Sequence, residues 1–237
     1  MFKVNLDSLD GRTKHLQKSQ VNIYTDGSKL ENQCGTGFAI YNGKHIILKY
    51  SERLPDESTV FQAEVRGIQK AAETMLMFEN LNKFKYIKIF TDSQATLLAL
   101  NSADVTSKLV LQTKLTLNEL AKKTRRITIV WIKAHVGHEG NELTDELAKE
   151  GTKKKLQTCN IGIPHNNIKT LIKTACRGIW DSEWLEYKEA KHTKHFYTET
   201  NEKRAKEAIK LSRLGLARLV KLVTDHGDLA YFYSNVN

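Results

Sequence analysis

The order of strand-like and helix-like segments between residues 21 and 151 constrains the fold more than any other feature of the sequence. Three β-rich runs come first, and the second and third are joined at Asn42-Gly43, which is a strong signal for a tight hairpin turn. Apolar residues at strand or helix spacing then give the order β-β-β-α-β-α-α-β-α. A hairpin sheet followed by β-α-β crossovers predicts an α/β fold, with a mixed sheet and helices on its faces.

The ends of the elements are marked by turn and capping residues. The first run, VNIYTD, is expected to end at Gly27-Ser28. Ser58 or Thr59 can cap the first long helix, because a side-chain oxygen at that position accepts a hydrogen bond from a free backbone N–H. The last helix is predicted to stop at Gly151.

Composition divides the chain into four parts. Residues 1–20 are polar and without pattern, and we expect a leader or linker there. Residues 21–152 carry the segment order above and form one domain, whereas residues 153–164, with a lysine triplet and a proline, form a basic linker. Residues 165–237 are expected to be a mostly helical region of unknown role. A chain of 237 residues has room for one sizeable core and such an appendage.

The chain carries an excess of positive charge. Its 37 Lys and Arg residues outnumber 27 Asp and Glu residues, for a net charge of +10. Such an excess favours polyanionic partners, nucleic acid first, although it also serves solubility alone. Three cysteines without metal or disulfide spacing fit a reducing, intracellular setting, in which cytoplasm and nucleus are not distinguished. No apolar run reaches about 18 residues, so no segment is expected to span a membrane.

Four acidic residues stand in positions that are unusual for a solvated surface. Asp26 and Asp92 each follow an apolar β run and a threonine, and each precedes a small residue. If the two strands are parallel neighbours, their carboxyl ends place both carboxylates side by side. Glu64 lies on or beside the apolar stripe of the first helix, where a buried carboxylate needs a cation or a proton. Asp145 lies in the first turns of the last helix.

Each of these acids also has a purely structural interpretation. Asp26 and Asp92 could be turn formers, and Glu64 could reach solvent from the edge of its stripe. Asp145 could simply favour the helix N-terminus electrostatically. The conjunction of all four indicates a site instead. Oxygen ligands suit a hard cation such as Mg2+, and two such ions about 3.5–4 Å apart form a known clamp for phosphodiester cleavage.

Four short segments resemble the ribonuclease H family in order, spacing and context, namely YTDGS, QAE, FTDSQ and WIKAHVGHEGNELTDELAK. The resemblance covers roughly residues 20–152, and it is strongest to the ribonuclease H domains of non-LTR retrotransposon polyproteins. It implies a ribonuclease H-like five-stranded mixed sheet flanked by helices. It also implies a divalent-metal-dependent endonuclease that uses two Mg2+ ions, or Mn2+, to hydrolyse the RNA strand of RNA–DNA hybrids.

The resemblance further implies roles for individual residues. The metal ligands would be Asp26, Glu64, Asp92 and Asp145. His135 falls where the family has a mobile loop histidine that assists proton transfer or product release, and His138 falls where a further histidine often lies. Asn141 and Glu142 fit the family's turn before the last helix. The positions that would touch the backbone and minor groove of the hybrid are Ser28, Ser93 and Gln94.

The sequence departs from the family pattern in three places. Ala134 stands where many relatives have glycine, and Val60 and Phe61 stand where cellular enzymes often have an asparagine pair. The spacing from Asp92 to Trp131 leaves no room for the basic protruding helix with which some cellular enzymes grip the hybrid. The basic residues that could replace that helix lie in two runs, at residues 122–126 and 153–155.

Three interpretations of the function follow from the sequence. The first is a hybrid-cleaving ribonuclease whose partners are an RNA–DNA hybrid and a reverse transcriptase domain of the parent element. The second is a weakly active or inactive domain that binds hybrid or structured RNA, and the third is another nuclease of the same superfamily. Residues 165–237 resemble the stretch that follows ribonuclease H in such elements, so the chain could be a fragment of a longer polyprotein. Trp180 and Trp184, four positions apart there, are expected to pack in a helix rather than to stack on bases.

Overall fold

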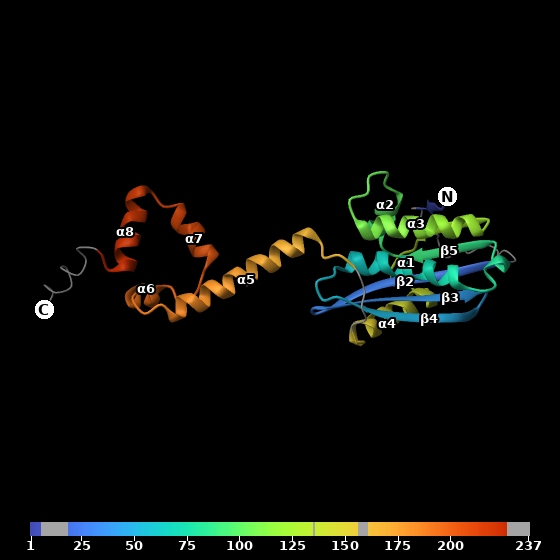
Figure 1. Ribbon diagram of the computed structural model, residues 1–237, viewed down its shortest axis with the longest axis horizontal. Helices are drawn as coiled ribbons and strands as arrows, with labels where there is room; N and C mark the ends of the chain where they lie inside the picture. The colour runs from blue at the N-terminus through green and yellow to red at the C-terminus, as the bar shows by residue number, and fades with distance from the viewer. Residues whose placement is uncertain (6–18, 135, 156–160, 227–237) are drawn as a thin grey trace. The chain divides into compact units, whose positions relative to one another are not determined.

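The computed structural model describes residues 1–5, 19–134, 136–155 and 161–226. The chain divides into two compact units, Met1–Pro164 and His165–Asn237, and each is considered by itself (Figure 1). Within the described ranges, no helix is both long enough and apolar enough to cross a membrane.

The first unit is built on a six-stranded mixed sheet with the spatial order β1-β6-β5-β2-β3-β4. Neighbouring strands are parallel from β1 to β2, and antiparallel from β2 to β4. The strands are Lys3–Asn5 (β1), Gln20–Leu30 (β2), Gln33–Asn42 (β3), His45–Leu54 (β4), Tyr86–Thr91 (β5) and Arg126–Trp131 (β6). The expected mixed sheet is therefore confirmed. So is the hairpin turn between β3 and β4, where Gly43 has a φ of +64°.

The sheet has one strand more than the five that were expected. Residues Lys3–Asn5, inside the stretch interpreted as a leader or linker, form β1 and pair in parallel with β6. Three residues are too few for an alternating apolar pattern to be recognised, so the sequence carries no signal for this strand. The pairing covers the edge of β6, which would otherwise present unpaired backbone groups.

Helices cover both faces of the sheet (Figure 1). The helices are Val60–Met77 (α1), Leu81–Lys83 (η1, a 3-10 turn), Gln94–Asn101 (α2), Lys108–Lys123 (α3) and Glu139–Lys153 (α4). α1, α2 and α3 share one core with the sheet, in which Ile23, Phe38 and Leu117 are fully buried. α4 packs on the other face, against β2, β3 and β4. Thr59 caps α1 as predicted, since its side chain accepts a hydrogen bond of 3.2 Å from the Gln62 N–H.

β2 is longer than the sequence indicated. It continues past Gly27, where the strand was expected to end, and reaches Leu30 because its pairing with β3 extends that far. Gly27 is needed for a different reason. A Cβ at this position would lie 2.6 Å from the Glu64 backbone nitrogen, so only glycine lets α1 come this close to the strand.

α4 likewise continues to Lys153, past Gly151, where a stop was expected. A Cβ on Gly151 would lie 2.7 Å from the Glu52 backbone oxygen of β4. On the sheet side, a Cβ on Gly37 of β3 would lie 2.6 Å from the Ala148 nitrogen. α4 therefore rests directly on the backbone of the sheet at these points, with no side chain between them.

We expect Gly37→Ala to lower the free energy of unfolding by about 1–3 kcal/mol, the usual cost of overpacking, because the new methyl group meets backbone rather than a side chain that can move. Urea denaturation measures the change. Gly162→Ala is the matched control, since none of the described residues lies within 4 Å of a Cβ at that position. Equal stability of the two variants would contradict the close packing of α4.

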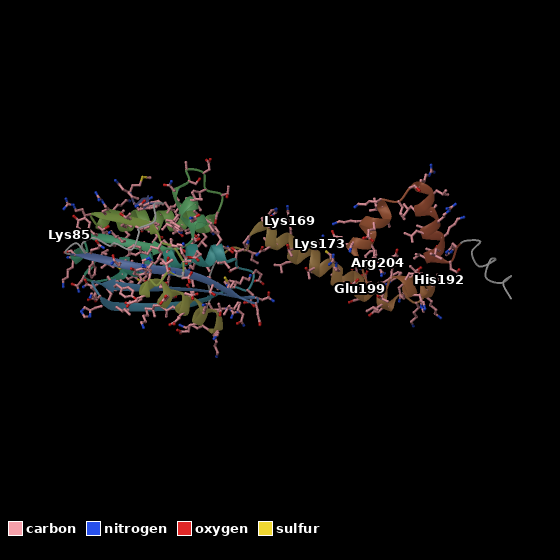
Figure 2. All side chains as sticks on the ribbon, turned by 180° about the vertical axis from the view of Figure 1, so that it is seen from behind. Lys85, Lys169, Lys173, His192, Glu199 and Arg204 are labelled. Carbon is pink, nitrogen blue, oxygen red and sulfur yellow. The ribbon has the colours of Figure 1, made fainter. Side chains whose placement is uncertain are left out.

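The second unit is helical, as expected. Its helices are His165–Glu186 (α5), Lys191–Phe196 (α6), Glu202–Ile209 (α7) and Arg213–Thr224 (α8). Lys169 and Lys173 lie one turn apart on α5 (Figure 2), and Glu202 of α7 pairs with Lys173 and Arg177. Val223 is the single buried residue among those that the structure describes in this unit, so these helices hold a very small core.

Candidate active site

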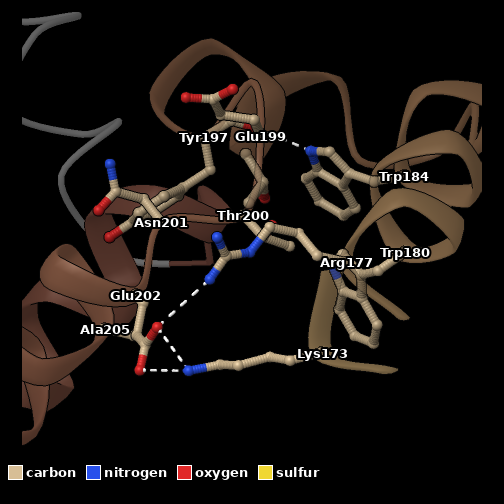
Figure 3. Close-up of a pocket in the computed structure, with 11 residues that line it drawn as sticks. Lys173, Arg177, Trp180, Trp184, Tyr197, Glu199, Thr200, Asn201, Glu202 and Ala205 are labelled. Atoms are coloured by element: carbon tan, nitrogen blue, oxygen red, sulfur yellow. Dashed lines mark hydrogen bonds and ion pairs between the residues drawn. The ribbon is translucent and has the colours of Figure 1, made fainter. Parts of the chain in front are cut away.

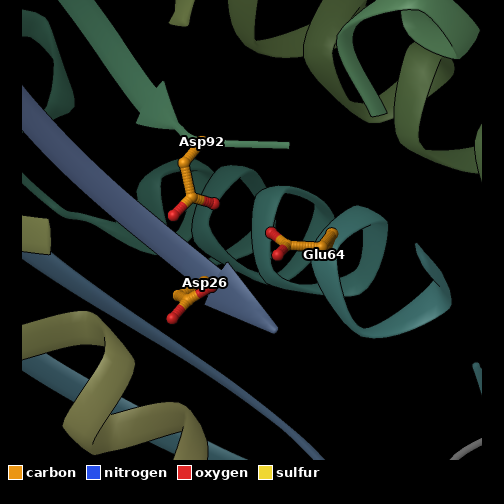
Figure 4. Close-up of side chains that lie close together, drawn as sticks. All are labelled: Asp26, Glu64 and Asp92. Carbon is orange, nitrogen blue, oxygen red and sulfur yellow. The ribbon is translucent and has the colours of Figure 1, made fainter. Parts of the chain in front are cut away.

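Three of the acids singled out in the sequence meet beside the inner strands β2 and β5, near the carboxyl end of β5. A carboxylate oxygen of Asp26, one of Glu64 and one of Asp92 all lie within 4.8 Å of one another (Figure 4). The strand register explains the meeting of two of them. β2 and β5 are parallel and pair Tyr24 with Phe90, and Asp26 and Asp92 each come two residues further along. We call these three residues the carboxylate cluster.

Asp26 lies inside β2 and is held by backbone groups. Its Oδ1 accepts a hydrogen bond of 2.8 Å from the Gly27 N–H, and its backbone oxygen accepts one of 3.0 Å from the Thr36 hydroxyl of β3. The residue is only 8% exposed. Its carboxylate is therefore fixed in position and largely removed from water.

Glu64 is brought to the cluster by α1. The residue is 5% exposed and lies in the helix segment that Gly27 allows to approach β2. The Thr91 hydroxyl, at the end of β5, donates a hydrogen bond of 3.5 Å to Glu64 Oε2. The expectation that Glu64 faces the sheet rather than solvent is confirmed by its burial.

Asp92 follows β5 and is anchored from two sides. The Trp131 indole N–H donates a hydrogen bond of 3.0 Å to the Asp92 backbone oxygen, which ties the end of β5 to the end of β6. The Asn141 side-chain amide donates one of 3.4 Å to Asp92 Oδ2. The Oδ1 of Asn141 is itself buried and has no hydrogen-bond partner among the residues that the structure describes, so this side chain still has one acceptor to offer inside the site.

The electrostatics of the cluster follow from crowding like charges where water is scarce. Burial, and then the charge of Asp92, raise the pKa of Asp26 to about 6. Burial, followed by Asp26 and Asp92, raises the pKa of Glu64 well above its ordinary value. Asp26 and Glu64 are therefore stabilised by protons or by a cation, and the all-oxygen donor set that they form with Asp92 suits a hard divalent ion. The residues present thus fit a divalent metal.

Asp145, the fourth expected ligand, does not join the cluster. Its Oδ2 accepts a hydrogen bond of 2.6 Å from the Lys149 ammonium one turn later on α4, and the two form an ion pair. The negative charge of Asp145 makes a small contribution to the raised pKa of Asp26, after burial and the charge of Asp92. The sequence offered a signal for this pair, because opposite charges at i and i+4 on a helix are neighbours.

Apart from the three substrate contacts, the other residues expected at the site come from the segment that leads into α4 and from the first turn of this helix. His135 lies outside the described residues. His138 is the N-cap residue of α4 and makes no side-chain cap hydrogen bond. Asn141 and Glu142 lie in the first turn of α4, so their expected place in a turn before the helix is wrong. The contact of Asn141 with Asp92 has no signature in the sequence, since it depends on where α4 packs.

The three expected substrate contacts lie on the elements that carry Asp26 and Asp92. Ser28 is a half-buried residue of β2, two positions after Asp26. Ser93 is the N-cap of α2, where its hydroxyl accepts a hydrogen bond of 3.3 Å from the Thr96 N–H. Gln94 is exposed in the first turn of the same helix. All three are thus near the cluster in sequence, and Ser93 has a structural role as well.

The two basic runs, residues 122–126 and 153–155, lie on different elements of the first unit. Arg126, in the first run, pairs with Tyr86 at the start of β5, whereas Asp92 follows the end of that strand. Six residues at about 3.3 Å per residue put this run about 20 Å from the carboxylate cluster along the strands. In the second run, Lys154 is paired with Glu150 and donates to the Ser51 backbone oxygen. The first run is therefore poorly placed to grip a substrate beside the cluster.

Comparison with known proteins identifies the family. A family model described as RNase H matches residues 18–153, which contain the whole carboxylate cluster. The chain belongs to the ribonuclease H family. Ribonuclease H of Campylobacter jejuni is 32% identical over 144 residues, covering 56% of this chain and 92% of that protein. Ribonuclease H1 of Rattus norvegicus is 31% identical over 147 residues, covering 56% of this chain and 50% of that protein.

Solved structures of the family resemble the same part of the chain. RNase H1 from the halophilic archaeon Halobacterium salinarum matches with a TM-score of 0.46 and 24% identity, covering 56% of this chain and 96% of that one. LC11-RNase H1 in complex with an RNA/DNA hybrid matches with a TM-score of 0.46 and 20% identity, over the same shares of the two chains. The second unit lies outside the ribonuclease H family match, which ends at residue 153.

We expect the metal-free protein to lose stability, relative to Asp26→Asn, as the pH rises from about 4 to about 7. The pKa of Asp26 is about 6 in the folded chain and 3.8 ordinarily, so the folded state holds a proton that the unfolded chain releases. Stability from this group is full below the lower pKa and is lost as the pH rises through the upper one, by about 2–3 kcal/mol in all. The raised pKa of Glu64 acts in the same direction.

Urea denaturation in EDTA at several pH values gives the required free energies. Asp104→Asn, at an exposed aspartate between α2 and α3, is the control and keeps the wild-type dependence. Parallel pH profiles of wild type and Asp26→Asn would show that neither burial nor the charge of Asp92 raises the pKa of Asp26 in the folded protein.

Proposed function

We propose that this chain is a divalent-metal-dependent endonuclease that hydrolyses the RNA strand of RNA–DNA hybrids. The observation that carries the proposal is the carboxylate cluster of Asp26, Glu64 and Asp92, two of them buried, in a member of the ribonuclease H family. The relatives that match this part of the chain carry the name ribonuclease H. Membership of the family supports the reaction, and the cluster supports the dependence on metal.

The four acids would hold two Mg2+ ions, and the same oxygen ligands would accept Mn2+. Asp26, Glu64 and Asp92 are already within reach of one another, whereas Asp145 would have to release Lys149. Two divalent ions at such a site supply activation of the attacking water and stabilisation of the leaving 3′ oxygen. Because Asp26 and Glu64 are buried, their interactions with charge in the site are stronger than they would be in water.

The neighbouring residues would orient the ligands and the substrate. The Gly27 N–H and the Asn141 amide direct Asp26 and Asp92. Polar groups at Ser28, Ser93 and Gln94 would sense the 2′-hydroxyls, which distinguish the RNA strand from the DNA strand. His135 would accept or deliver a proton, or ease release of the product. The net charge of +10 would supply affinity that is independent of sequence and falls with added salt.

The origin and partners of the chain are a further part of the proposal. The segments FQAEVRGIQKA and AHVGHEGNELTDELAK resemble those of non-LTR retrotransposon polyproteins. We therefore infer a chain derived from such an element, with a reverse transcriptase domain of the parent element as its partner. In the parent reaction, that partner would make the hybrid that the ribonuclease H domain then cleaves.

We expect Asp92→Asn to lower the rate of RNA-strand cleavage by at least about two orders of magnitude, because it removes a charged ligand on which transition-state stabilisation depends. A fluorescently labelled hybrid incubated in Mg2+, Mn2+ or EDTA reports the rate on a denaturing gel. Binding of the intact hybrid, measured by anisotropy in Ca2+, should change little. Asp104→Asn is the control and should cleave at the wild-type rate.

Equal turnover of wild type in EDTA and in Mg2+ would reject the role of the metal. Cleavage of duplex DNA in place of the hybrid would instead indicate another nuclease of the superfamily. A third result, binding of the hybrid by wild type without product, would favour the second candidate function described next.

The second candidate is a weakly active domain that binds hybrid or structured RNA. One observation favours it: Asp145 is occupied by Lys149 and stands outside the carboxylate cluster. An ion pair of this kind on a helix surface contributes about 0.3–0.5 kcal/mol, which a divalent ion can displace. The pair therefore reduces metal affinity slightly and does not abolish it.

We expect Lys149→Gln to lower the Mg2+ concentration for half-maximal cleavage about twofold, since Asp145 no longer has to break an ion pair. Titration of the initial rate with Mg2+ measures the effect. Lys70→Gln removes an ion pair with Glu73 on α1, away from the proposed site, and should leave the titration unchanged. A higher Mg2+ requirement in Lys149→Gln would mean that Lys149 assists the site instead of competing for it.

A further inference from the structure

The second unit contains a cavity of about 680 Å³, within the range of typical ligand pockets (Figure 3). α5 forms one wall, and the segment from α6 to α7 forms the other. Figure 3 shows the Trp180 and Trp184 rings on one side, with Tyr197 and Thr200 opposite and the Arg177 side chain reaching across. We call this cavity the tryptophan pocket.

Trp184 packs in the way that the sequence predicted for both tryptophans. Its indole N–H donates a hydrogen bond of 2.8 Å to the Tyr197 backbone oxygen, and its ring stacks on Tyr187 with centroids 6.4 Å apart. The Lys194 ammonium lies 5.7 Å from the same ring. Trp184 is therefore a fixed part of the wall.

Trp180 does not pack in that way. The residue is 60% exposed, and no ring or cation of the described residues contacts its indole. An exposed indole in a cavity presents a wide, rigid apolar face at little cost in conformational entropy. The expectation of helix packing thus holds for Trp184 and is wrong for Trp180.

A polar group in the same pocket lacks a partner. The Thr200 hydroxyl oxygen is buried and has no hydrogen-bond partner among the described residues. Buried polar groups are almost always satisfied in native proteins. Thr200 lines the pocket, so a ligand that displaces the atoms covering this hydroxyl would supply its missing hydrogen bond.

Positive charge surrounds the pocket. Among its lining residues, Lys173 and Arg177 are balanced by Glu199 and Glu202. Three further cations surround these residues: Lys206 pairs with Glu202, Arg204 lies over Tyr197, and Lys194 lies over Trp184. Asp181, which accepts a hydrogen bond of 2.8 Å from the Thr200 N–H, adds a third acid, so the five cations named here outnumber the three acids by two. This excess of positive charge favours an anionic ligand.

We propose that the tryptophan pocket binds single-stranded nucleic acid, with a base stacked on Trp180 and phosphates facing Lys173, Arg177 and the rim cations. A nucleotide combines a planar face, a hydrogen-bonding edge and an anion, and the pocket offers a partner for each. An acidic peptide would match the charge but not the planar ring. Aromatic platforms beside cations bind single strands with little sequence preference. This site is separate from the proposed catalytic function.

The test uses the full chain and a fluorescein-labelled single-stranded DNA of about 12 nucleotides, a length within the usual site sizes. Anisotropy is measured in EDTA, so that no divalent-dependent cleavage interferes. Trp180→Ala should weaken binding about 5- to 150-fold, the range expected for loss of one stacked base. Trp180→Phe should restore most of the affinity. Ile179→Ala, at an equally exposed neighbour that does not line the pocket, should bind like wild type.

A second measurement locates the contact directly. A 5-bromouracil-substituted strand should photocrosslink to the peptide that contains Trp180. Unchanged binding in Trp180→Ala, equal losses in Trp180→Ala and Ile179→Ala, or crosslinks confined to residues 20–153 would each overturn the proposal. Hybrid cleavage by Trp180→Ala should remain at the wild-type rate. A failure of the catalytic proposal would show in that assay alone, and it would leave the binding result unaffected.

Discussion

The crowding of two buried carboxylates, Asp26 and Glu64, beside the half-buried Asp92 is the constraint on which the organisation of this molecule depends. Asp26 and Asp92 are forced together by the parallel register of β2 and β5, and Glu64 is added by a helix that only Gly27 allows to come near. Isolated from water, these groups favour protons or a cation, as the raised pKa values of Asp26 and Glu64 show. The fold therefore holds an arrangement that is electrostatically unfavourable by itself and that a divalent ion would relieve.

Much of this arrangement could be predicted from the sequence because it depends on local signals and strand order. The Thr59 cap and the Asn42-Gly43 turn are recognisable from short-range chemistry. The proximity of Asp26 and Asp92 followed from treating their strands as parallel neighbours, which β2 and β5 are. These features need no knowledge of how side chains pack.

The features that the sequence did not reveal depend on tertiary contact. Gly27 and Gly151 were interpreted as stops, because a glycine that relieves a clash between helix and sheet looks the same in sequence as one that turns the chain. Strand β1 is too short to show a pattern, and the bond from Asn141 to Asp92 exists only once α4 is docked. The exposure of Trp180 also depends on tertiary contact, because helical spacing alone does not show which side chains of a helix pack against another element.

The seating of α4 has a mechanical consequence. Gly140, Thr144, Ala148 and Thr152 form a ridge of small buried residues at intervals of four along this helix. At Gly140 the ridge meets the Tyr24 ring, whereas at Ala148 and Thr152 it meets the backbone of Gly35 and Gly37 in β3, so no flexible side chain absorbs small displacements at those two positions. If β3 tilted, α4 would move with it, and Asn141 and Asp145 would shift together. The geometry of the proposed metal ligands therefore depends on the rigidity of β3, a strand that contributes no ligand itself.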